Sequence, residues 1–256
     1  IGRHSQSTYQ LFPYLQIFKR LLKENNARRI GMIGLACHIQ ALRKLQAMSG
    51  KWAELARTQI PFCIEIACSS STKSEGTATM ISEVAKVPLE EVKELRYRSG
   101  QYPGQVMIRT RDGEVTEIPF WQAVEHFKAY KTHRCLSCAD WMSGLADISI
   151  CDGDPNIFQA SKLGASTSKK HCVMLVRTEL GQRVVNEAKG TNALRAHRLE
   201  GDGFKEELNL GLQRKRHRRQ HYESLDIPIN KSPIPGYKED FTALADELLL
   251  EVQNEK

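Results

Sequence analysis

Cys135 and Cys138, three residues apart, have the spacing in this sequence that most directly indicates chemistry. Two thiolates in a CxxC turn bind one metal centre together. Zinc or an iron–sulfur cluster takes about four ligands, so this pair needs two more. Cys37 and Cys68 are the candidates, because each ends a predicted buried strand, and ligands bind at the carboxyl ends of the strands in an open α/β sheet. The sequence therefore predicts one metal or cluster centre held by all four cysteines.

The remaining cysteines and the single CxxC leave other interpretations open. A redox-active CxxC or plain structural thiols would use the same residues, and zinc is the main rival of an iron–sulfur cluster. The double CxxC of a zinc ribbon and the CxxCxxC run of a bacterial ferredoxin are both absent from the sequence. Cys63 and Cys172 lie in the middle of predicted strands, so we expect them to be core thiols. The position of Cys151 favours neither role.

The composition is that of a folded globular protein with a basic balance of charge. The chain has 256 residues, of which 41% are hydrophobic and 26% charged, which excludes a disordered tail, a collagen-like chain and a coiled-coil rod. No apolar run approaches the ~20 residues of a membrane helix, so we expect no membrane-spanning segment. The net charge of +7 favours an anionic partner, which would be nucleic acid, a phosphate-bearing cofactor or an acidic protein face.

The cysteine count and the start of the chain indicate a location. Seven cysteines cannot all pair within one chain, and the sequence does not open with a recognisable signal peptide. We therefore expect a reducing, cytoplasmic compartment, including attachment at the periphery of a membrane complex. Ile1 stands where an initiator methionine would, which predicts a processed chain or a piece of a longer one.

Strand and helix patterns alternate along most of the chain. Apolar runs predict strands over 29–36, 60–68, 145–150 and 171–177, and helical periodicity predicts helices over 9–26, 38–48, 77–85, 121–130 and 181–189. This alternation predicts an α/β fold with a parallel or mixed core sheet flanked by helices. Between 94 and 119, three short strands with a hairpin signal at Asp112-Gly113 predict a small antiparallel β insertion.

The predicted organisation has four parts. Residues 1–90 begin the α/β core, 91–120 form the antiparallel insertion, 121–200 carry the CxxC loop and the rest of the core, and 201–256 form a helical tail. We expect a polar turn at 151–155 and a loop over 156–170. The tail joins a basic helix over 204–222 to an acidic helix over 241–252. Its basic run, Arg214–Arg219, favours an acidic partner subunit over nucleic acid, because aromatic residues are only 7% of the chain and base stacking needs them.

Several motifs in register resemble the coenzyme F420 hydrogenase/dehydrogenase beta-subunit family. Gly34–Leu45 resembles the family's G-T-P-C segment, with Leu35-Ala36 in place of Thr-Pro, and Ile64–Cys68 resembles its next strand. Cys135–Cys138 followed by Leu145–Ser149 resembles its C-x-x-C and L-A-D-I-S signature, and Val176–Gly181 resembles its R-T-x-x-G turn. The segment 213–228 is similar to the family's basic helix, so the resemblance covers about residues 1–230.

The resemblance implies a flavoprotein that holds FAD beside a 4Fe–4S cluster. Members of the family move electrons between coenzyme F420, an 8-hydroxy-5-deazaflavin, or a related carrier and a hydrogenase, dehydrogenase or reductase partner subunit. By motif position, the cluster ligands here would be Cys37, Cys68, Cys135 and Cys138. The resemblance thus implies an oxidoreductase subunit of a multi-subunit complex, with F420 or ferredoxin as the electron carrier and no nucleic-acid partner.

Polar residues near the motifs are the candidate FAD contacts: Ser5, Ser7, Lys131, His133, Gly153 and Asp154. Each has a second interpretation, because the serines would also cap a helix, the residues before the CxxC would also form a solvated loop, and Asp before Pro is common in turns. We assign hydride chemistry to the flavin and predict no catalytic side chain.

The function that these patterns predict is electron transfer through FAD and a 4Fe–4S cluster. Two alternatives remain at this point. One is a ferredoxin-dependent reductase of another substrate in the same family. The other is a zinc-stabilised nucleic-acid-binding module that uses the basic C-terminal helix.

Overall fold

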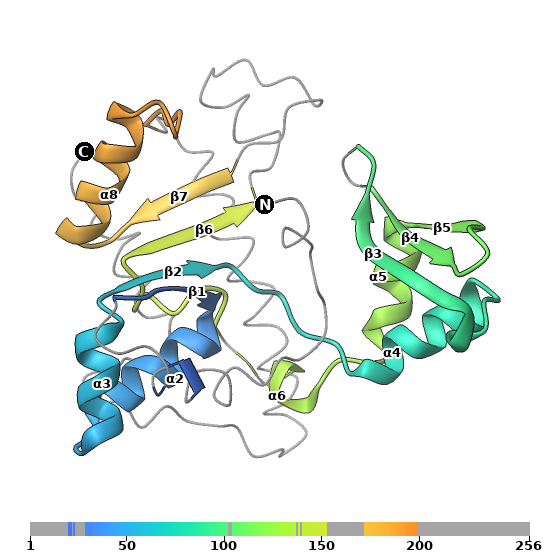
Figure 1. Ribbon diagram of the computed structural model, residues 1–256, viewed down its shortest axis with the longest axis horizontal. Coiled ribbons are helices and arrows are strands. Elements are labelled where there is room, and N and C mark those ends of the chain that lie inside the picture. Colours follow the sequence, from blue (N-terminus) through green and yellow to red (C-terminus); the bar gives the residue numbers. More distant parts are fainter. Residues whose placement is uncertain are drawn as a thin grey trace, which may run out of the picture. The chain divides into compact units, whose positions relative to one another are not determined.

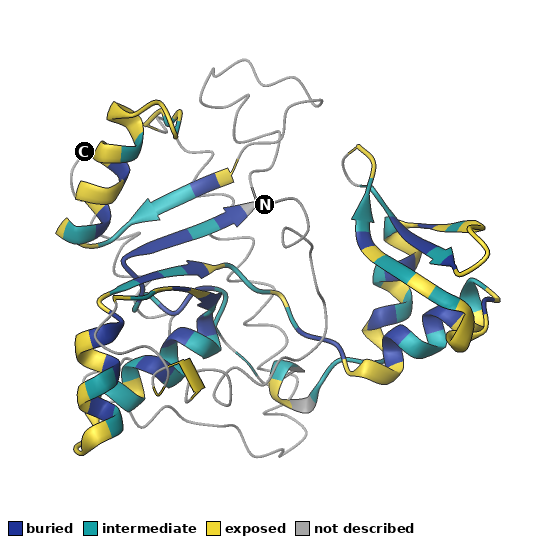
Figure 2. Cartoon of the chain, viewed as in Figure 1, coloured by how far each residue is buried: buried dark blue, intermediate teal, exposed yellow. Residues whose placement is uncertain are grey.

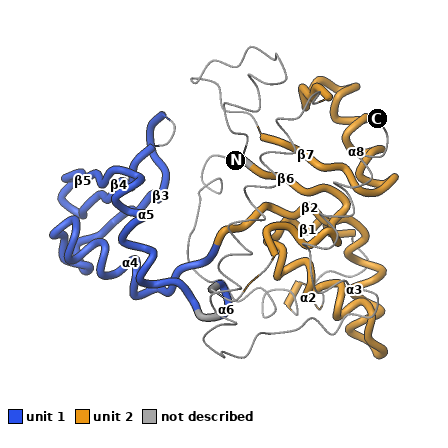
Figure 3. Tube along the Cα trace, turned by 180° about the vertical axis from the view of Figure 1, so that it is seen from behind, with its two compact units in different colours: residues 1–12, 70–136 blue, residues 13–69, 137–256 orange. Residues whose placement is uncertain are grey.

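The chain divides into two compact units, which are described separately (Figure 3). Unit 1 comprises residues 1–12 and 70–136, and unit 2 comprises residues 13–69 and 137–256. The structure, a computed structural model, describes residues 20–21, 23, 29–101, 104–136, 138, 140–152 and 172–198. All seven cysteines lie within these ranges.

Unit 2 is built on a four-stranded mixed sheet (Figure 1). Its strands are β1 (Gly31–Leu35), β2 (Phe62–Ile66), β6 (Ile148–Asp152) and β7 (Cys172–Val176). The order across the sheet is β1-β2-β6-β7; the first three strands are parallel, and β7 pairs antiparallel with β6. This arrangement confirms the predicted α/β fold with a mixed core sheet.

Helices α2 (Ala36–Ala47) and α3 (Lys51–Gln59) connect β1 to β2. These helices, strands β1 and β2 and the residues that precede β2 and β6 contribute to one buried cluster: Met32, Ile39, Leu42, Ala56, Ile60, Cys63 and Ala146. The sequence pattern predicts no element over α3, because two alanines make its buried side and its apolar stripe is weak. Helix α8 (Glu179–Gly190) follows β7, and the hydroxyl of Thr178 caps it by accepting from the Gly181 N–H at 3.1 Å.

Unit 1 confirms the predicted antiparallel insertion and adds helices to it. Strands β3 (Val92–Ser99), β4 (Gln105–Thr110) and β5 (Val115–Pro119) form one sheet in that order. The helical elements are α4 (Ser74–Thr79), the π-helical turn η1 (Met80–Val84), the 3-10 helix η2 (Leu89–Glu91), α5 (Phe120–Lys128) and α6 (His133–Leu136). Gly113, at φ +99°, occupies the hairpin turn between β4 and β5, where a residue with a side chain would be strained.

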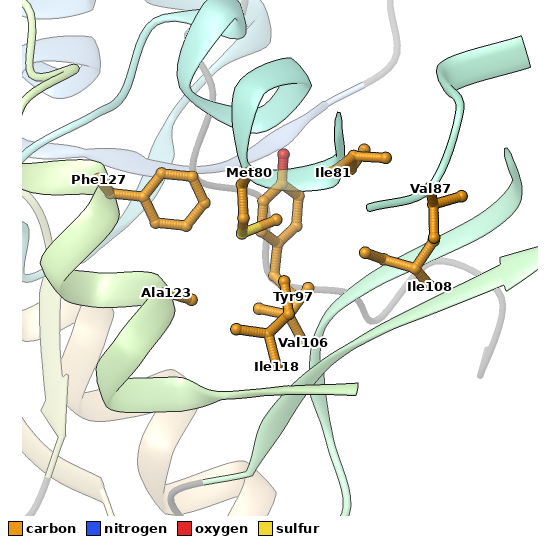
Figure 4. Packing of buried hydrophobic residues seen from close by; sticks show 9 residues of the cluster. All are labelled: Met80, Ile81, Val87, Tyr97, Val106, Ile108, Ile118, Ala123 and Phe127. Atoms are coloured by element: carbon orange, nitrogen blue, oxygen red, sulfur yellow. The ribbon is translucent and has the colours of Figure 1, made fainter. Parts of the chain in front are cut away.

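An apolar cluster fills the space between the sheet and the helices of unit 1. Figure 4 shows its nine buried side chains pointing toward one another: Met80, Ile81, Val87, Tyr97, Val106, Ile108, Ile118, Ala123 and Phe127. The Tyr97 and Phe127 rings lie 6.2 Å apart between centroids, and the Tyr97 hydroxyl is satisfied by the Thr77 hydroxyl at 2.7 Å. Buried and exposed residues are interspersed along the strands and helices of this unit (Figure 2).

Two cysteine predictions change in the structure and one is confirmed. Cys172 is exposed at the first position of β7, so its assignment as a mid-strand core thiol is wrong. The polar turn predicted from residue 151 does not begin there. Strand β6 continues through Asp152, paired with β7, and Cys151 is buried. Cys63 is fully buried in β2, as expected.

Other predictions lie outside the described residues. They are the loop over 156–170, the helical tail over 201–256 with Arg214–Arg219, and most of the helix predicted over 9–26, of which residues 20, 21 and 23 are described as helical. Among the helices that the structure describes, none combines the length and the apolar run that crossing a bilayer requires.

Candidate metal centre

Cys37 lies in the first turn of α2, just beyond the carboxyl end of β1. The sequence pattern predicts Cys37 at the end of the strand itself, but β1 stops at Leu35 and the helix begins at Ala36. The Leu35 N–H donates to Nδ1 of His38 at 3.2 Å, which secures this strand-to-helix turn. Burial lowers the pKa of His38, a direction that favours the neutral imidazole whose Nδ1 accepts this bond.

Cys68 lies two residues beyond the end of β2, at the same edge of the sheet. The Ala67 N–H still donates to the Ile150 carbonyl at 2.8 Å, as in a strand. The next amide, that of Cys68, turns away and donates to the Trp141 carbonyl at 3.0 Å. Cys68 is therefore held against the segment that follows Cys138.

Cys138 begins a segment that is attached to both neighbouring elements. The Cys138 thiol donates to the Asp140 carbonyl at 3.6 Å, and the Asp140 carboxylate accepts from the Gln40 side chain of α2 at 2.6 Å. Together with the Cys68–Trp141 bond, these contacts bring the segment to the carboxyl edge of β1 and β2. Three of the four predicted ligands, Cys37, Cys68 and Cys138, thus lie on segments near the carboxyl ends of β1 and β2 in unit 2.

Cys135 belongs to unit 1, in the short helix α6. Its N–H donates to the Thr132 hydroxyl at 3.3 Å, and its sulfur accepts the Ser71 N–H at 3.2 Å. Amide donors to sulfur stabilise the thiolate form and tune the potential of cysteine-ligated metal centres. The association of Cys135 with Cys138 stays a prediction from their spacing.

The seven cysteines fall into three groups by exposure. The four candidate ligands are half-buried, Cys63 and Cys151 are buried, and Cys172 is exposed; all seven carry thiols. Burial raises the pKa of Cys63 to about 11, which disfavours the thiolate that a metal needs. Within the described ranges, no three Cys, His, Asp or Glu side chains are grouped as ligands around one ion. The donor chemistry of the four half-buried thiols nevertheless fits zinc or an iron–sulfur cluster.

A buried carboxylate next to the candidate ligands was not predicted. Glu65, in β2, is completely buried and accepts from the Ser143 N–H at 2.7 Å, the Gly144 N–H at 3.3 Å and the Ser149 hydroxyl at 2.5 Å. The Ser149 hydroxyl in turn accepts from Nε of Arg177 at 2.9 Å. Burial lowers the pKa of Arg177, and the nearby charge of Glu65 opposes this shift.

A second buried carboxylate, Asp147, joins three elements of unit 2. It accepts from the Cys63 N–H at 2.8 Å and from the Thr178 hydroxyl at 2.7 Å, and it faces the Arg43 guanidinium at 3.7 Å. A Cβ on Gly181 would come within 2.6 Å of the Asp147 carbonyl oxygen, so this close approach of α8 requires glycine.

These two carboxylates explain part of the motifs seen in the sequence. Arg43, Glu65, Asp147 and Gly181 all lie in the quoted segments, yet each acts by holding the backbone in place. The signal that would have found Glu65 is a charged residue inside an apolar strand, because such a residue needs buried partners.

The candidate FAD contacts are only partly described. Ser5, Ser7, Gly153 and Asp154 lie outside the described residues. The backbone of Lys131 forms an isolated antiparallel bridge with Thr72, and His133 begins α6. These six residues stay predictions.

The fold defines a class: an α/β domain with an antiparallel insertion and half-buried cysteines just beyond the carboxyl ends of β1 and β2. A family model described as the C terminus of the beta subunit of coenzyme F420 hydrogenase/dehydrogenase matches residues 27–201. This match covers more than half of the chain, and the chain belongs to this family.

Two curated proteins named coenzyme F420 hydrogenase subunit beta are similar to the chain. The one from Methanococcus voltae is 23% identical over 180 residues, which cover 70% of this chain and 56% of that protein. The one from Methanosarcina barkeri (strain Fusaro / DSM 804) is 23% identical over 161 residues, which cover 61% of this chain and 52% of that protein. The chain thus spans little more than half the length of these relatives.

A solved structure has the same fold. It is a chain in a xenon-derivatized structure of the F420-reducing NiFe hydrogenase complex from Methanosarcina barkeri. The TM-score is 0.61 at 17% sequence identity, and the match covers 89% of this chain and 73% of that chain. At this identity the likeness establishes the fold alone.

Proposed function

We propose that this chain is part of a redox subunit that passes electrons between coenzyme F420, or a related carrier, and a partner enzyme through FAD and a 4Fe–4S cluster. Family membership supports an electron-transfer role. The observation that carries the proposal is the set of half-buried thiols, three of them on segments near the carboxyl ends of β1 and β2.

In this proposal, Cys37, Cys68, Cys135 and Cys138 hold the cluster. The contacts of Gln40 with Asp140 and of Cys68 with Trp141 keep the cysteine-bearing segments at the strand ends. The Ser71 N–H donates to the Cys135 sulfur and so orients this side chain. When bound, FAD supplies the exchange between two-electron hydride chemistry and one-electron transfer.

Charge supports the proposed cofactor and partner. The excess of seven positive charges suits the pyrophosphate of FAD, the anionic tail of a deazaflavin and an acidic partner surface. Lys131 and His133, directly before the CxxC, stay our candidates for flavin contact. Family membership favours this function over the zinc-stabilised nucleic-acid-binding module.

Anaerobic purification of the intact protein from its source tests the proposal. We expect a brown protein with FAD and about four irons per chain, as a single 4Fe–4S cluster requires. Reduced F420, ferredoxin and nicotinamide are then compared as donors, and F420 should reduce the flavin fastest. Colourless, iron-free protein would refute the cluster, and a zinc content of about one per chain would favour the rival metal.

A further inference from the structure

We propose that Glu65 is the positioning residue for Cys138: its buried carboxylate fixes the segment 138–144 along β2 and thereby sets where the Cys138 thiol lies. The relevance of this position to a cluster rests on the function proposed above. The placement itself is a property of the chain and is testable without any cofactor.

The segment that starts at Cys138 runs back along β2. Trp141 contacts Cys68 through its carbonyl, Ser143 contacts Glu65, and Asp147 contacts Cys63. Along this path the partners move from Cys68, beyond the carboxyl end of β2, to Cys63, near its start. The chain then turns into β6, which runs parallel to β2. A fixed point in this path therefore determines how far the segment reaches toward the sheet edge.

Glu65 supplies the strongest fixed point on this path. Its oxygens accept from the N–H groups of Ser143 and Gly144. They also accept from the Ser143 hydroxyl at 2.5 Å. A carboxylate accepts several donors at once, and hydrogen bonds to a charged acceptor are stronger than neutral ones. Glutamine in its place would have one acceptor oxygen fewer, and its N–H₂ group would face N–H and O–H donors.

Partners on the sheet hold the carboxylate itself in place. The Ser149 hydroxyl donates to it from β6, and Arg177, after β7, donates to that hydroxyl. Nη2 of Arg177 also approaches the Met142 sulfur at 3.9 Å, so the same guanidinium contacts the segment. Met142, Ser143 and Ser149 are all buried. The network therefore connects β2, β6 and the end of β7 to the cysteine-bearing segment.

Thiol labelling of the metal-free full chain tests the placement directly. We expect E65Q to raise the alkylation rate of Cys138 by about 10-fold or more, since lost bonds to a charged acceptor are worth that factor. The rate at Cys172, exposed on β7, should not change. Ser143→Ala, which removes one donor and keeps both amides, should give a smaller increase. An unchanged Cys138 rate in both variants overturns the proposal.

A matched control separates positioning from general stability. Asp147→Asn alters the other buried carboxylate of unit 2, which binds Cys63 and Thr178 rather than the segment near Cys138. Compared at equal folded fraction, E65Q should release iron to a chelator about 10- to 100-fold faster than wild type, the range found for residues that support metal ligands. Asp147→Asn should release it at the wild-type rate.

The outcomes distinguish the two proposals. If wild type binds no iron, the proposed function fails, and the labelling result still decides the role of Glu65. If wild type binds iron and E65Q and Asp147→Asn release it at equal rates, Glu65 has only a structural role and the positioning proposal is wrong.

Discussion

Both units have an apolar core, but they differ in the polar side chains that they bury. The core of unit 1 is an apolar cluster from Met80 to Phe127, and the buried polar side chains in its described part are hydroxyls: Ser71, Thr72, Thr77 and Thr110. The described part of unit 2 buries two carboxylates, Glu65 in β2 and Asp147 just before β6. Glu65 binds the Ser143 amide, in the segment that follows Cys138, and Asp147 binds the Cys63 amide, near the start of β2.

This difference in buried side chains indicates which interactions each unit depends on for its stability. Apolar burial is non-directional and tolerates repacking, whereas a buried carboxylate stabilises the fold only when all its partners are in place. Unit 2 therefore depends on the directional contacts of these two carboxylates. The comparison predicts that unit 2 is most sensitive to the loss of a charge, and unit 1 to the loss of apolar volume.

Removing the second carboxylate should produce the largest effect. Asp147→Ala leaves the buried Cys63 amide without an acceptor and Arg43 without its carboxylate, and we expect a loss of about 4 kcal/mol in unfolding free energy. Hydrogen exchange of peptides from β2 and β6 measures it. A loss below about 1 kcal/mol, within the range of an ordinary surface contact, would contradict the dependence of unit 2 on this charge.

Truncating a central residue of unit 1 should have the next largest effect. Ile108 is completely buried in β4, and Ile108→Ala should cost about 3 kcal/mol through lost burial and a cavity. Val115→Ala, on β5 with its side chain 46% exposed, is the control and should cost less than about 0.5 kcal/mol. The denaturant midpoint of each variant, measured by hydrogen exchange of β4 peptides, checks both expected losses. Equal losses would mean that apolar burial does not dominate this unit.

A glycine on α8 provides a third test. Gly181→Ala brings a Cβ against the Asp147 carbonyl oxygen and should cost about 2 kcal/mol through overpacking. Gly190, at the end of the same helix, has open space around it, so Gly190→Ala should be neutral or stabilising by up to about 1 kcal/mol. Thermal unfolding of the two variants is compared. The same shift in both would show that α8 does not approach Asp147 closely.

The last test concerns pH. Burial raises the pKa of Cys63 from 9.0 to about 11, so in alkali the unfolded chain loses this proton before the folded chain does. The folded state then binds more protons, and stability contributed by the neutral thiol falls as the pH rises from about 9 to about 11. The difference in stability between wild type and Cys63→Ala should shrink over this window. A constant difference would show that Cys63 titrates normally.

Much of the fold was predictable from the sequence because its strands are short apolar runs. The mixed sheet, the antiparallel insertion and the buried position of Cys63 follow from such runs. Helix α3 was not predicted because its buried side consists largely of alanines. The end of β6 was not predicted because Asp152 is polar, although its backbone pairs with β7.

The candidate site was predictable only in part. Cysteine spacing indicated which residues to consider, since strand ends gather at one edge of a parallel sheet. The role of Glu65 was not predictable, because its partners Ser143, Ser149 and Arg177 lie 78 to 112 residues further along the chain and meet it only after folding. Exposure of Cys172 depends on where β7 begins, and strand ends are the least reliable part of any sequence prediction.

The most direct test of the central claim is iron content in a matched series of Cys→Ser variants of the intact protein, purified without oxygen. We predict that replacing Cys37, Cys68, Cys135 or Cys138 lowers the iron content and abolishes the paramagnetic signal of the reduced cluster. Replacing the exposed Cys172 should leave both at the wild-type level. Wild-type iron and signal in the Cys135→Ser and Cys138→Ser variants would contradict the claim.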